Sequence, residues 1–371
     1  MKIKVNRKVF ADALNRVGKC AAKSPVLPHL SNVKIDAMEG TVILTTTDLE
    51  QRMIFGVDAE VIQQGTTTLP AKKLLSLANS MSGELIEMQT DENHHTTIKS
   101  GRTKAKLFGL PPDDFPEGVD FAPVSVAKLK TTDIIQTVKC GAYAACPAES
   151  RRVLQGALFT FAENEVTVVS TDGKRLAKSS VPSPDLFAEA KQYILPVNGI
   201  NFLQQLNTDE AELFFSEKHF YCKSERIMYS CRLIEGSFPN WQAVVPRSFS
   251  KTAEIDTELF ISALKTVTVV RDNQPLISIT VSDQSMELKS ESRESGIITD
   301  SFDISENNSG LAGFDPVTIR LNAQFILDAL IAFGGKGKIS FKFNDYMNPL
   351  QISNGESFAI IMPIRNSDGA K

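Results

Sequence analysis

The chain has 371 residues, 42% of them hydrophobic and 23% charged, which is enough apolar material for ordinary folded cores and unlike the composition of a disordered protein. Its formal net charge of −4 does not by itself favour nucleic acid as a partner. The sequence contains no apolar run of about 18 residues, the length a membrane helix needs. The start MKIKVNRKVF lacks the apolar core of a signal peptide, so we expect a cytoplasmic protein with no membrane partner.

The thiols and histidines do not suggest a metal site or a disulfide framework. The cysteines are odd in number and none shows C-x-x-C spacing, so buried, reduced thiols are predicted for Cys20, Cys140, Cys146, Cys222 and Cys231. The adjacent His94 and His95 lie in a polar stretch, TDENHHTT, that is more typical of a turn than of a metal centre. We therefore expect neither a metal nor a cofactor.

Amphipathic helices are predicted at six places, beginning in chain order near Arg7, Pro70, Thr131, Pro196, Asp256 and Asn322. They form two interleaved sets. Members of the first set are 124 and 125 residues apart, and members of the second set are 126 and 126 residues apart. A period of this length matches a small domain rather than a solenoid repeat, so the chain is interpreted as three copies of a two-helix unit.

The helix boundaries follow from local signals. The first helix should end before Ser24 and Pro25, since proline disfavours helical geometry in the residue before it. Thr132 and Asp133 are expected to start the third helix, and Asp256 the fifth. The second helix of each copy opens with a good capping or first-turn residue, namely Pro70, Pro196 and Asn322.

Between the helices, β-branched or alternating runs predict strands at 41–45, 165–169, 214–221, 277–281 and 338–343. Each copy is therefore expected to be an α+β layer in which two helices cover one face of an antiparallel sheet. The motif L-x-x-x-x-F-P occurs as LPPDDFP from Leu110 and as LIEGSFP from Leu233, 123 residues later. We expect domains at 1–122, 123–250 and 251–371.

Charge is distributed unevenly along these copies. The segments that contain the six predicted helices together carry a net charge of +8, which leaves −12 for the rest of the chain; they are 7–23, 70–81, 131–152, 196–207, 256–271 and 322–338. Such a distribution can attract a polyanion to the helical surface and repel it from the others.

Six strings then indicate a family: TTTDLE (45–50), SGRTKAKLFGLPPDDFP (100–116), STDGKRLA (170–177), EGSFPNW (235–241), NAQFILDAL (322–330) and IIMPIR (360–365). Together they resemble the bacterial sliding clamp, the beta subunit of DNA polymerase III, in the same order and over essentially the full length. The resemblance implies a DNA clamp fold of three similar domains that pairs head to tail into a ring-shaped homodimer around double-stranded DNA. It also implies a processivity factor rather than an enzyme.

The resemblance further implies three sets of site residues. Sequence-independent contacts with duplex DNA are expected from Lys23, Ser24, Lys72, Arg102, Arg151, Arg152, Asn198, Asn322 and Phe325. The ring interface is expected to join the first domain of one chain, at Lys73 and Leu107, to the third domain of a second chain, at Val269 and Val270. Glu291, Glu294 and Asp300 are expected as acidic complements.

The third set is a hydrophobic pocket between the second and third domains. It is expected to bind short peptide motifs of the DNA polymerase III alpha subunit, the clamp loader, other polymerases and repair proteins. Its residues are Leu154, Thr171, Gly173, Lys174, Arg175, Leu176, Pro239, Val244, Ile360, Met362, Pro363, Ile364 and Arg365. Lys174 stands where the family often has histidine.

Two other classes of protein were weighed. An enzyme is disfavoured because GGKGK (334–338) has the wrong spacing for a phosphate-binding loop and no nucleophile motif accompanies the carboxylate pairs. A monomeric peptide-binding scaffold that does not encircle DNA is the alternative function.

Overall fold

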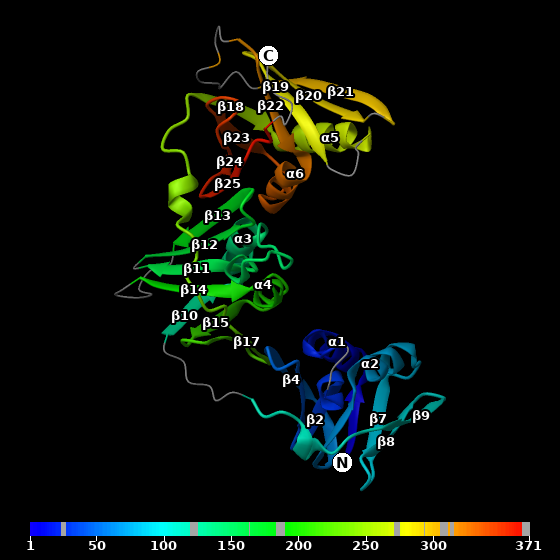
Figure 1. The fold of residues 1–371 in the computed structure, drawn as a ribbon. Coiled ribbons are helices and arrows are strands. Elements are labelled where there is room, and N and C mark those ends of the chain that lie inside the picture. The colour runs from blue at the N-terminus through cyan, green and yellow to red at the C-terminus, as the bar shows by residue number, and fades with distance from the viewer. Residues whose placement is uncertain are drawn as a thin grey trace. The chain divides into compact units, whose positions relative to one another are not determined.

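The structure, a computed structural model, describes residues 1–23, 27–118, 125–162, 164–182, 190–270, 275–292, 294–304, 311 and 315–365, without the side chains of 125–129. Ser24, the predicted boundary at 122 and the tail 366–371 lie outside the described residues. The chain forms two compact units (Figure 1), Met1–Lys130 with Thr208–Leu233, and Thr131–Asn207 with Ile234–Lys371. The middle copy of the repeat is thus divided between the units.

Six α-helices are found at the six predicted places: α1 (Arg7–Val17), α2 (Ala71–Ser80), α3 (Thr131–Ala142), α4 (Val197–Leu203), α5 (Thr257–Val267) and α6 (Ala323–Ala332). Asp256 caps α5 by accepting the Leu259 N–H at 2.9 Å, and Asn322 caps α6 by accepting the Gln324 N–H at 2.9 Å. These caps explain why two starts could be predicted from the sequence.

Two predicted details were wrong. Helix α3 begins at Thr131, so Thr132 and Asp133 lie in its first turn instead of before it. The stretch 214–221 is not one strand but the end of β15 (Glu210–Phe215), a turn, and the start of β16 (His219–Lys223). The turn closes because the Ser216 hydroxyl accepts the His219 N–H at 3.0 Å, a local bond that the apolar pattern concealed.

The first unit contains two antiparallel sheets. The five-stranded sheet has the order β5 (Glu60–Gln63), β1 (Lys2–Asn6), β7 (Leu85–Thr90), β8 (His95–Ser100), β9 (Thr103–Phe108). The eight-stranded sheet has the order β10 (Ser125–Lys130), β15, β16, β17 (Ile227–Arg232), β4 (Gln51–Asp58), β3 (Thr41–Thr47), β2 (Asn32–Met38), β6 (Gly65–Pro70). Helices α1 and α2 pack side by side, with α1 against β1, β3 and β4 and α2 against β2 and β6.

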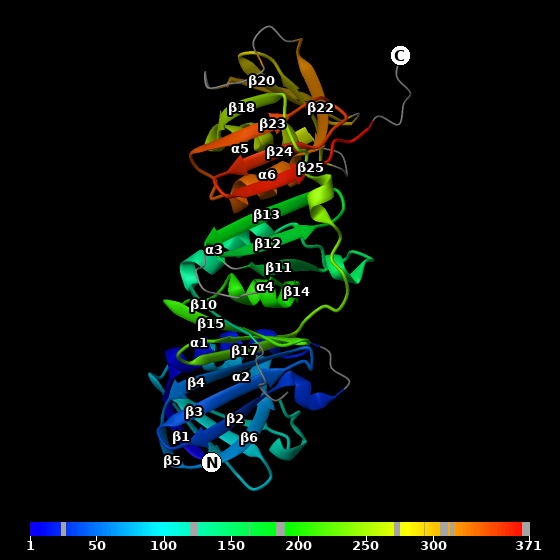
Figure 2. The ribbon, with the colours of Figure 1, turned by 90° about the vertical axis from the view of Figure 1, so that its left-hand side faces the viewer.

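The second unit repeats this design. Its eight-stranded sheet has the order β14 (Lys191–Pro196), β11 (Gly156–Ala162), β12 (Glu165–Thr171), β13 (Arg175–Pro182), β25 (Ser357–Ile361), β24 (Leu350–Asn354), β23 (Lys338–Phe343), β18 (Lys251–Asp256). The four-stranded sheet has the order β21 (Gly296–Asp303), β20 (Ser285–Ser292), β19 (Leu276–Val281), β22 (Val317–Asn322). Figure 2 shows the larger sheet from its outer side, with α3, α4 and α6 behind it.

Each eight-stranded sheet joins two copies of the repeat. In the first unit β17 of copy two pairs with β4 of copy one, with Cys231 opposite Gln51. In the second unit β25 of copy three pairs with β13 of copy two, with Ile361 opposite Arg175. Gln51 and Arg175 follow equivalent turns, because Asp48 accepts the Gln51 N–H at 2.8 Å and Asp172 accepts the Arg175 N–H at 3.0 Å. The two junctions therefore use the same edges in the same register.

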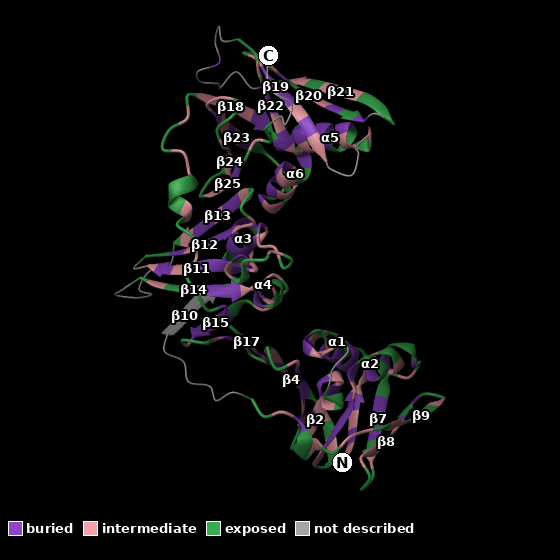
Figure 3. Ribbon diagram, in the orientation of Figure 1, coloured by how far each residue is buried: buried purple, intermediate pink, exposed green. Residues whose placement is uncertain are grey.

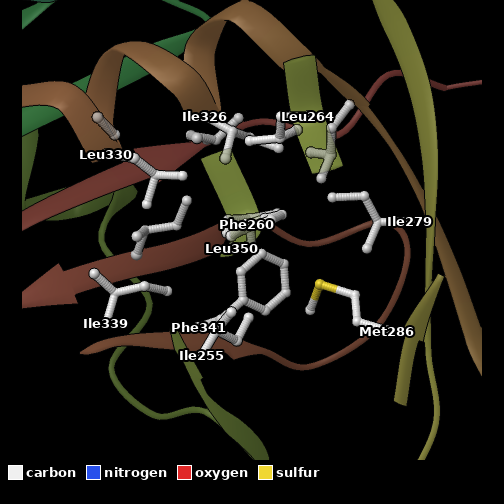
Figure 4. Packing of buried hydrophobic residues seen from close by; sticks show 14 of the residues in the cluster. Ile255, Phe260, Leu264, Ile279, Met286, Ile326, Leu330, Ile339, Phe341 and Leu350 are labelled. Atoms are coloured by element: carbon white, nitrogen blue, oxygen red, sulfur yellow. The ribbon is translucent and has the colours of Figure 1, made fainter. Parts of the chain in front are cut away.

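A large core of the second unit lies between α5, α6 and the strands of its two sheets. Figure 4 shows Phe260 of α5 facing Phe341 of β23, with Met286 of β20 beside them. The two rings meet edge on, with centroids 6.2 Å apart, and both are fully buried. The core thus links α5 to strands of both sheets.

The prediction of buried thiols is confirmed for four of the five cysteines. Cys20, Cys140, Cys222 and Cys231 are buried and Cys146 is half-buried, all as free thiols. Burial raises the pKa of Cys222 and of Cys231 to about 12, so both stay protonated at neutral pH. None of the helices in the described part of the chain has the length and hydrophobicity needed to cross a membrane.

We expect Phe260→Ala to lower the free energy of unfolding of the second unit by about 3–5 kcal/mol, because it leaves a cavity among aromatic neighbours. The measurement is urea unfolding followed by the fluorescence of Trp241, the chain's single tryptophan, which lies in that unit. Leu259→Ala is the matched control: Leu259 is 43% exposed, so its loss should cost about 0.5 kcal/mol. Equal effects of the two substitutions would contradict this core.

Candidate functional site

A pocket of about 240 Å³ lies in the second unit, beside the β13–β25 junction. The β12–β13 turn, the end of β25 and the short 3₁₀ helix η5 (Trp241–Val244) come together around it. It is lined by Arg151, Leu154, Thr171, Gly173, Lys174, Arg175, Leu176, Pro239, Asn240, Trp241, Val244, Ile360 and Met362. These residues come from four separate parts of the chain, which only the folded unit brings together.

Ten of the thirteen residues predicted for a pocket line this one. The other three, Pro363, Ile364 and Arg365, follow Met362 in the chain but do not line the pocket. The Met362 N–H donates to the Lys174 carbonyl at 3.0 Å, and the Ile364 N–H donates to the Arg320 carbonyl at 2.8 Å. The segment after β25 is thus held by backbone hydrogen bonds as it leaves the rim.

The pocket exists because an extra layer covers the outer face of the sheet. Side chains alternate along a strand, so Ala177 and Ala359 face the helices while Leu176 and Ile360 face outward. The outward pair packs in a small cluster with Ile234, against which Trp241 also packs. The chain from Ile234 through η5 therefore builds an apolar wall on a surface that an antiparallel sheet often leaves to solvent.

The β12–β13 turn is fixed by its own side chains. Thr171 Oγ1 accepts the Gly173 N–H at 3.0 Å and donates to the Arg175 carbonyl at 2.6 Å. Asp172 Oδ1 accepts the N–H groups of Lys174 and Arg175, each at 3.0 Å. The sequence T-D-G-K-R is therefore a capped turn that holds four residues of the pocket in place.

Glycine is favoured at position 173 for two reasons. Its φ of +83° lies in the left-handed region that favours glycine. A Cβ at this position would also lie 2.8 Å from Nη2 of Arg151. The guanidinium of Arg151 thus lies over the turn and would have to shift if residue 173 carried a Cβ.

Arg175 connects the pocket to the helices behind it. Its Nε lies 3.0 Å from Oδ2 of Asp172 and its Nη1 lies 2.5 Å from Oδ2 of Asp328 on α6. Its guanidinium carbon also lies 4.5 Å from the ring centre of Phe325 and 5.6 Å from that of Tyr143. Burial raises the pKa of Tyr143 above its ordinary range, although the nearby Arg175 charge opposes the rise. Arg175 is thus a structural link between copies two and three.

Residues predicted to contact DNA lie at exposed positions in both units: Lys23, Lys72 and Arg102 in the first, and Arg151, Arg152 and Asn198 in the second. Two others have structural contacts. The Asn322 side chain caps α6, and the Phe325 ring is half-buried beneath Arg175. Arg151 also lines the pocket, with its Nε 3.3 Å from Oε1 of Glu149. The backbone N–H and guanidinium of Arg151 lower the pKa of Glu149.

Three of the four residues predicted to face one another across a dimer interface lie on or against an edge strand. Leu107 is half-buried on the edge strand β9, and Lys73 is exposed on α2 of the same unit. In the second unit, Val269 is 75% exposed and Val270 is half-buried in the 3₁₀ helix η6 (Thr268–Val270), which packs against β20 and β21. Along both edge strands half-buried residues alternate with exposed ones (Figure 3).

Asn240 and Trp241 line the pocket but were not predicted. A signal was available in the sequence, because Trp241 ends the string EGSFPNW and lies two residues after Pro239, which was predicted to line the pocket. Its ring could equally have been a core residue, so the sequence alone did not assign it. Among the residues that the structure describes, no group of three or more His, Cys, Asp or Glu could hold a metal ion.

We expect Asp328→Asn to destabilise the second unit by about 1–3 kcal/mol, because Arg175 then loses a charged hydrogen-bond partner in a partly buried setting. Urea unfolding followed by Trp241 fluorescence measures this. Glu258→Gln is the matched control, since Glu258 is an exposed carboxylate on α5. A loss no larger than that of the control would show that the Arg175–Asp328 pair does not hold the two copies together.

The comparisons with known proteins cover nearly the whole chain. Family models of the DNA polymerase III beta subunit match with its N-terminal domain at residues 1–119, its central domain at 128–240 and its C-terminal domain at 242–365. The beta sliding clamp of Staphylococcus aureus is 27% identical, over 98% of this chain and 99% of that protein.

Solved structures agree. The sliding clamp of Bartonella birtlesii bound to griselimycin has a TM-score of 0.90 and 26% identity, covering 99% of this chain and all of that one. The DNA polymerase III beta subunit of Pseudomonas aeruginosa, 23% identical with the same coverage, has the same fold, with a TM-score of 0.90. The predicted resemblance and three-domain clamp fold are confirmed: the chain belongs to the DNA polymerase III beta subunit family of sliding clamps.

Proposed function

We propose that this chain is a DNA sliding clamp, a processivity factor that encircles duplex DNA as a ring-shaped homodimer. In this proposal it tethers the replicative polymerase and other replication and repair proteins through the pocket. The observation that carries it is the family match along the three copies, together with the way in which the copies join. Domains at 1–122, 123–250 and 251–371 are proposed, since the family models change near these boundaries.

The sheet edges support head-to-tail pairing of two chains. Each copy has two strands that can join a neighbouring copy. One is β4 or its counterpart β13 or β21, and the other is β17 or its counterpart β9 or β25. Each junction within the chain pairs one strand of each kind. Copy one keeps β9, the counterpart of β17 and β25, and copy three keeps β21, the counterpart of β4 and β13. The two remaining edges are complementary, but they belong to opposite ends of the repeat. A second copy of the chain can satisfy both edges at once, which gives a closed ring with two such interfaces.

The chemistry of the two edges supports this pairing. Strand β9 carries Lys104 and Lys106 and ends in Phe108, which is 68% exposed. Strand β21 carries Asp300 and Asp303, with an exposed Ile297 near its start. Opposite charges and exposed apolar side chains on complementary edges favour association and select its orientation.

DNA binding is proposed for five exposed basic residues: Lys72 on α2, and Lys23, Arg102, Arg151 and Arg152, which lie in turns or at the short 3₁₀ helix Arg152–Leu154. Ser24, Asn198, Asn322 and Phe325 are proposed as further contacts. Contacts from lysine and arginine to phosphates carry no sequence information and weaken with salt. A closed ring does not depend on their strength to stay on DNA, so weak contacts are compatible with sliding. The chain is proposed to act without catalysis, in the cytoplasm.

Partner binding is proposed for the apolar pocket, with Pro363, Ile364 and Arg365 at its exit. A buried leucine or phenylalanine anchor contributes about 1.5–3 kcal/mol. Two or three anchors, after the cost of association, give affinities on the order of micromolar. Such affinities suit the alpha subunit of the polymerase, the clamp loader and repair proteins, which must exchange on one ring.

We expect the double variant Val269→Asp, Val270→Asp to be monomeric, because two carboxylates at an apolar interface would be buried without partners. Light scattering distinguishes one chain from two. Ile62→Asp is the matched control, since Ile62 is 48% exposed on β5, the opposite edge of the β9 sheet. Dimers of the double variant that match those of the control would refute the interface.

We expect the protein to be retained at high salt on nicked circular plasmid after incubation with a bacterial clamp loader and ATP, because a closed ring is linked to a closed circle. Cutting the plasmid once should release it, since a ring slides off a free end. Gel filtration of labelled protein with plasmid measures both states. Failure to remain on the circle, with one-chain mass in solution, would favour the monomeric peptide-binding scaffold instead.

A further inference from the structure

The pocket combines an apolar floor with a cationic rim. Its floor and walls are formed by seven apolar residues, Leu154, Leu176, Pro239, Trp241, Val244, Ile360 and Met362. Its rim carries Arg151, Lys174 and Arg175, and no residue of the lining is a carboxylate. An occupant of this pocket would therefore place an apolar side chain among apolar atoms, with cations around its entrance.

The three cations are not equally available. Arg175 is paired with Asp172 and with Asp328, at 3.0 and 2.5 Å, and its side chain is 14% exposed. Arg151 is paired with Glu149 at 3.3 Å. Lys174 is exposed, and its ammonium has no ion-pair partner among the described residues. Lys174 is thus the cation that a ligand can reach without breaking an existing pair.

The backbone of Lys174 is fixed on both sides although its side chain is not. Its N–H donates to Oδ1 of Asp172 at 3.0 Å, and its carbonyl accepts the Met362 N–H at 3.0 Å. Met362 itself lines the pocket. The backbone from which the Lys174 side chain extends is therefore held in place at the pocket edge. A ligand group that pairs with the ammonium does not have to order the turn first.

We propose that Lys174 makes the pocket selective for peptides that carry a carboxylate next to their apolar anchor. This inference rests on the proposed function, because it specifies the partner of the same pocket. The carboxylate can come from an Asp or Glu side chain or from the free C-terminus of the partner, since both present the same group to an ammonium. Seating the anchor displaces water from the rim, which strengthens the charge pair relative to one in open solvent.

The test is a titration with Trp241 fluorescence as the reporter, because the single tryptophan of the chain lines the pocket. Four peptides share the same Leu and Phe anchors: one with an internal Glu beside the anchors, its Gln counterpart, one ending at the anchor with a free carboxylate, and its amidated form. We expect each carboxylate peptide to bind about two- to fivefold more tightly than its neutral counterpart, as for a partly exposed ion pair. The difference should shrink as salt is raised.

Two variants assign the effect to one side chain. In Lys174→Gln the ratio between carboxylate and neutral peptides should fall to about one, and in Lys174→Glu it should reverse. Lys336→Gln, which removes the same charge from an exposed position on the turn after α6, should keep the native ratio. The internal and terminal peptides tested separately show which source of carboxylate the rim prefers.

Equal binding of carboxylate and neutral peptides by the native chain would overturn the inference and leave the proposed peptide pocket intact. A preference that persists in Lys174→Gln would also overturn it, because another cation would then be responsible. Isothermal titration calorimetry serves as a second readout of binding. If none of the four peptides changes Trp241 fluorescence or gives a heat of binding, the proposed peptide-binding function fails, and the inference fails with it.

Discussion

Strand pairing between consecutive copies of the repeat is the constraint on which the rest of the structure depends. At β17–β4 and again at β13–β25, an edge strand of one copy is completed by an edge strand of the next. Unpaired backbone groups at a sheet edge tend to find a partner, and here the partner is the neighbouring copy. Of the same two kinds of strand, β9 and β21 each lie at the edge of their sheet, with no neighbour on the outer side among the described strands.

The pocket is a consequence of the second junction. Joining β13 to β25 puts Leu176 and Ile360 opposite each other on the outer face, where they need cover, and the chain from Ile234 to Val244 supplies it. Arg175, in the same pair of strands, points the other way and is held by Asp328 and the Phe325 ring. Alternation along one strand therefore gives the pocket its apolar floor and ties that floor to α6.

The first junction has the same turn but a different surface. Thr47 accepts the Leu49 N–H at 3.0 Å just as Thr171 accepts that of Gly173, and Leu49 has a φ of +79° where Gly173 has +83°. The repeat thus preserves the backbone of the turn while its side chains diverge. A glycine in copy two admits the Arg151 guanidinium, whereas the leucine in copy one is exposed. Shared backbone bonds define the fold, and individual side chains define the site.

The sequence by itself determined the periodicity, the six helix positions and the α+β class, because capping residues and apolar spacing act within a few residues of chain. It also indicated ten pocket residues through the family resemblance, eight of them inside the quoted strings and two, Leu154 and Val244, outside them. The tertiary structure alone decided that 214–221 turns back on itself, that Trp241 lies in the pocket wall and that Arg151 covers Gly173. It also decided that two of the three rim cations, Arg151 and Arg175, are already paired with carboxylates. These features depend on contacts between residues as far apart as Arg175 and Asp328, and no local pattern records which distant groups folding will bring together.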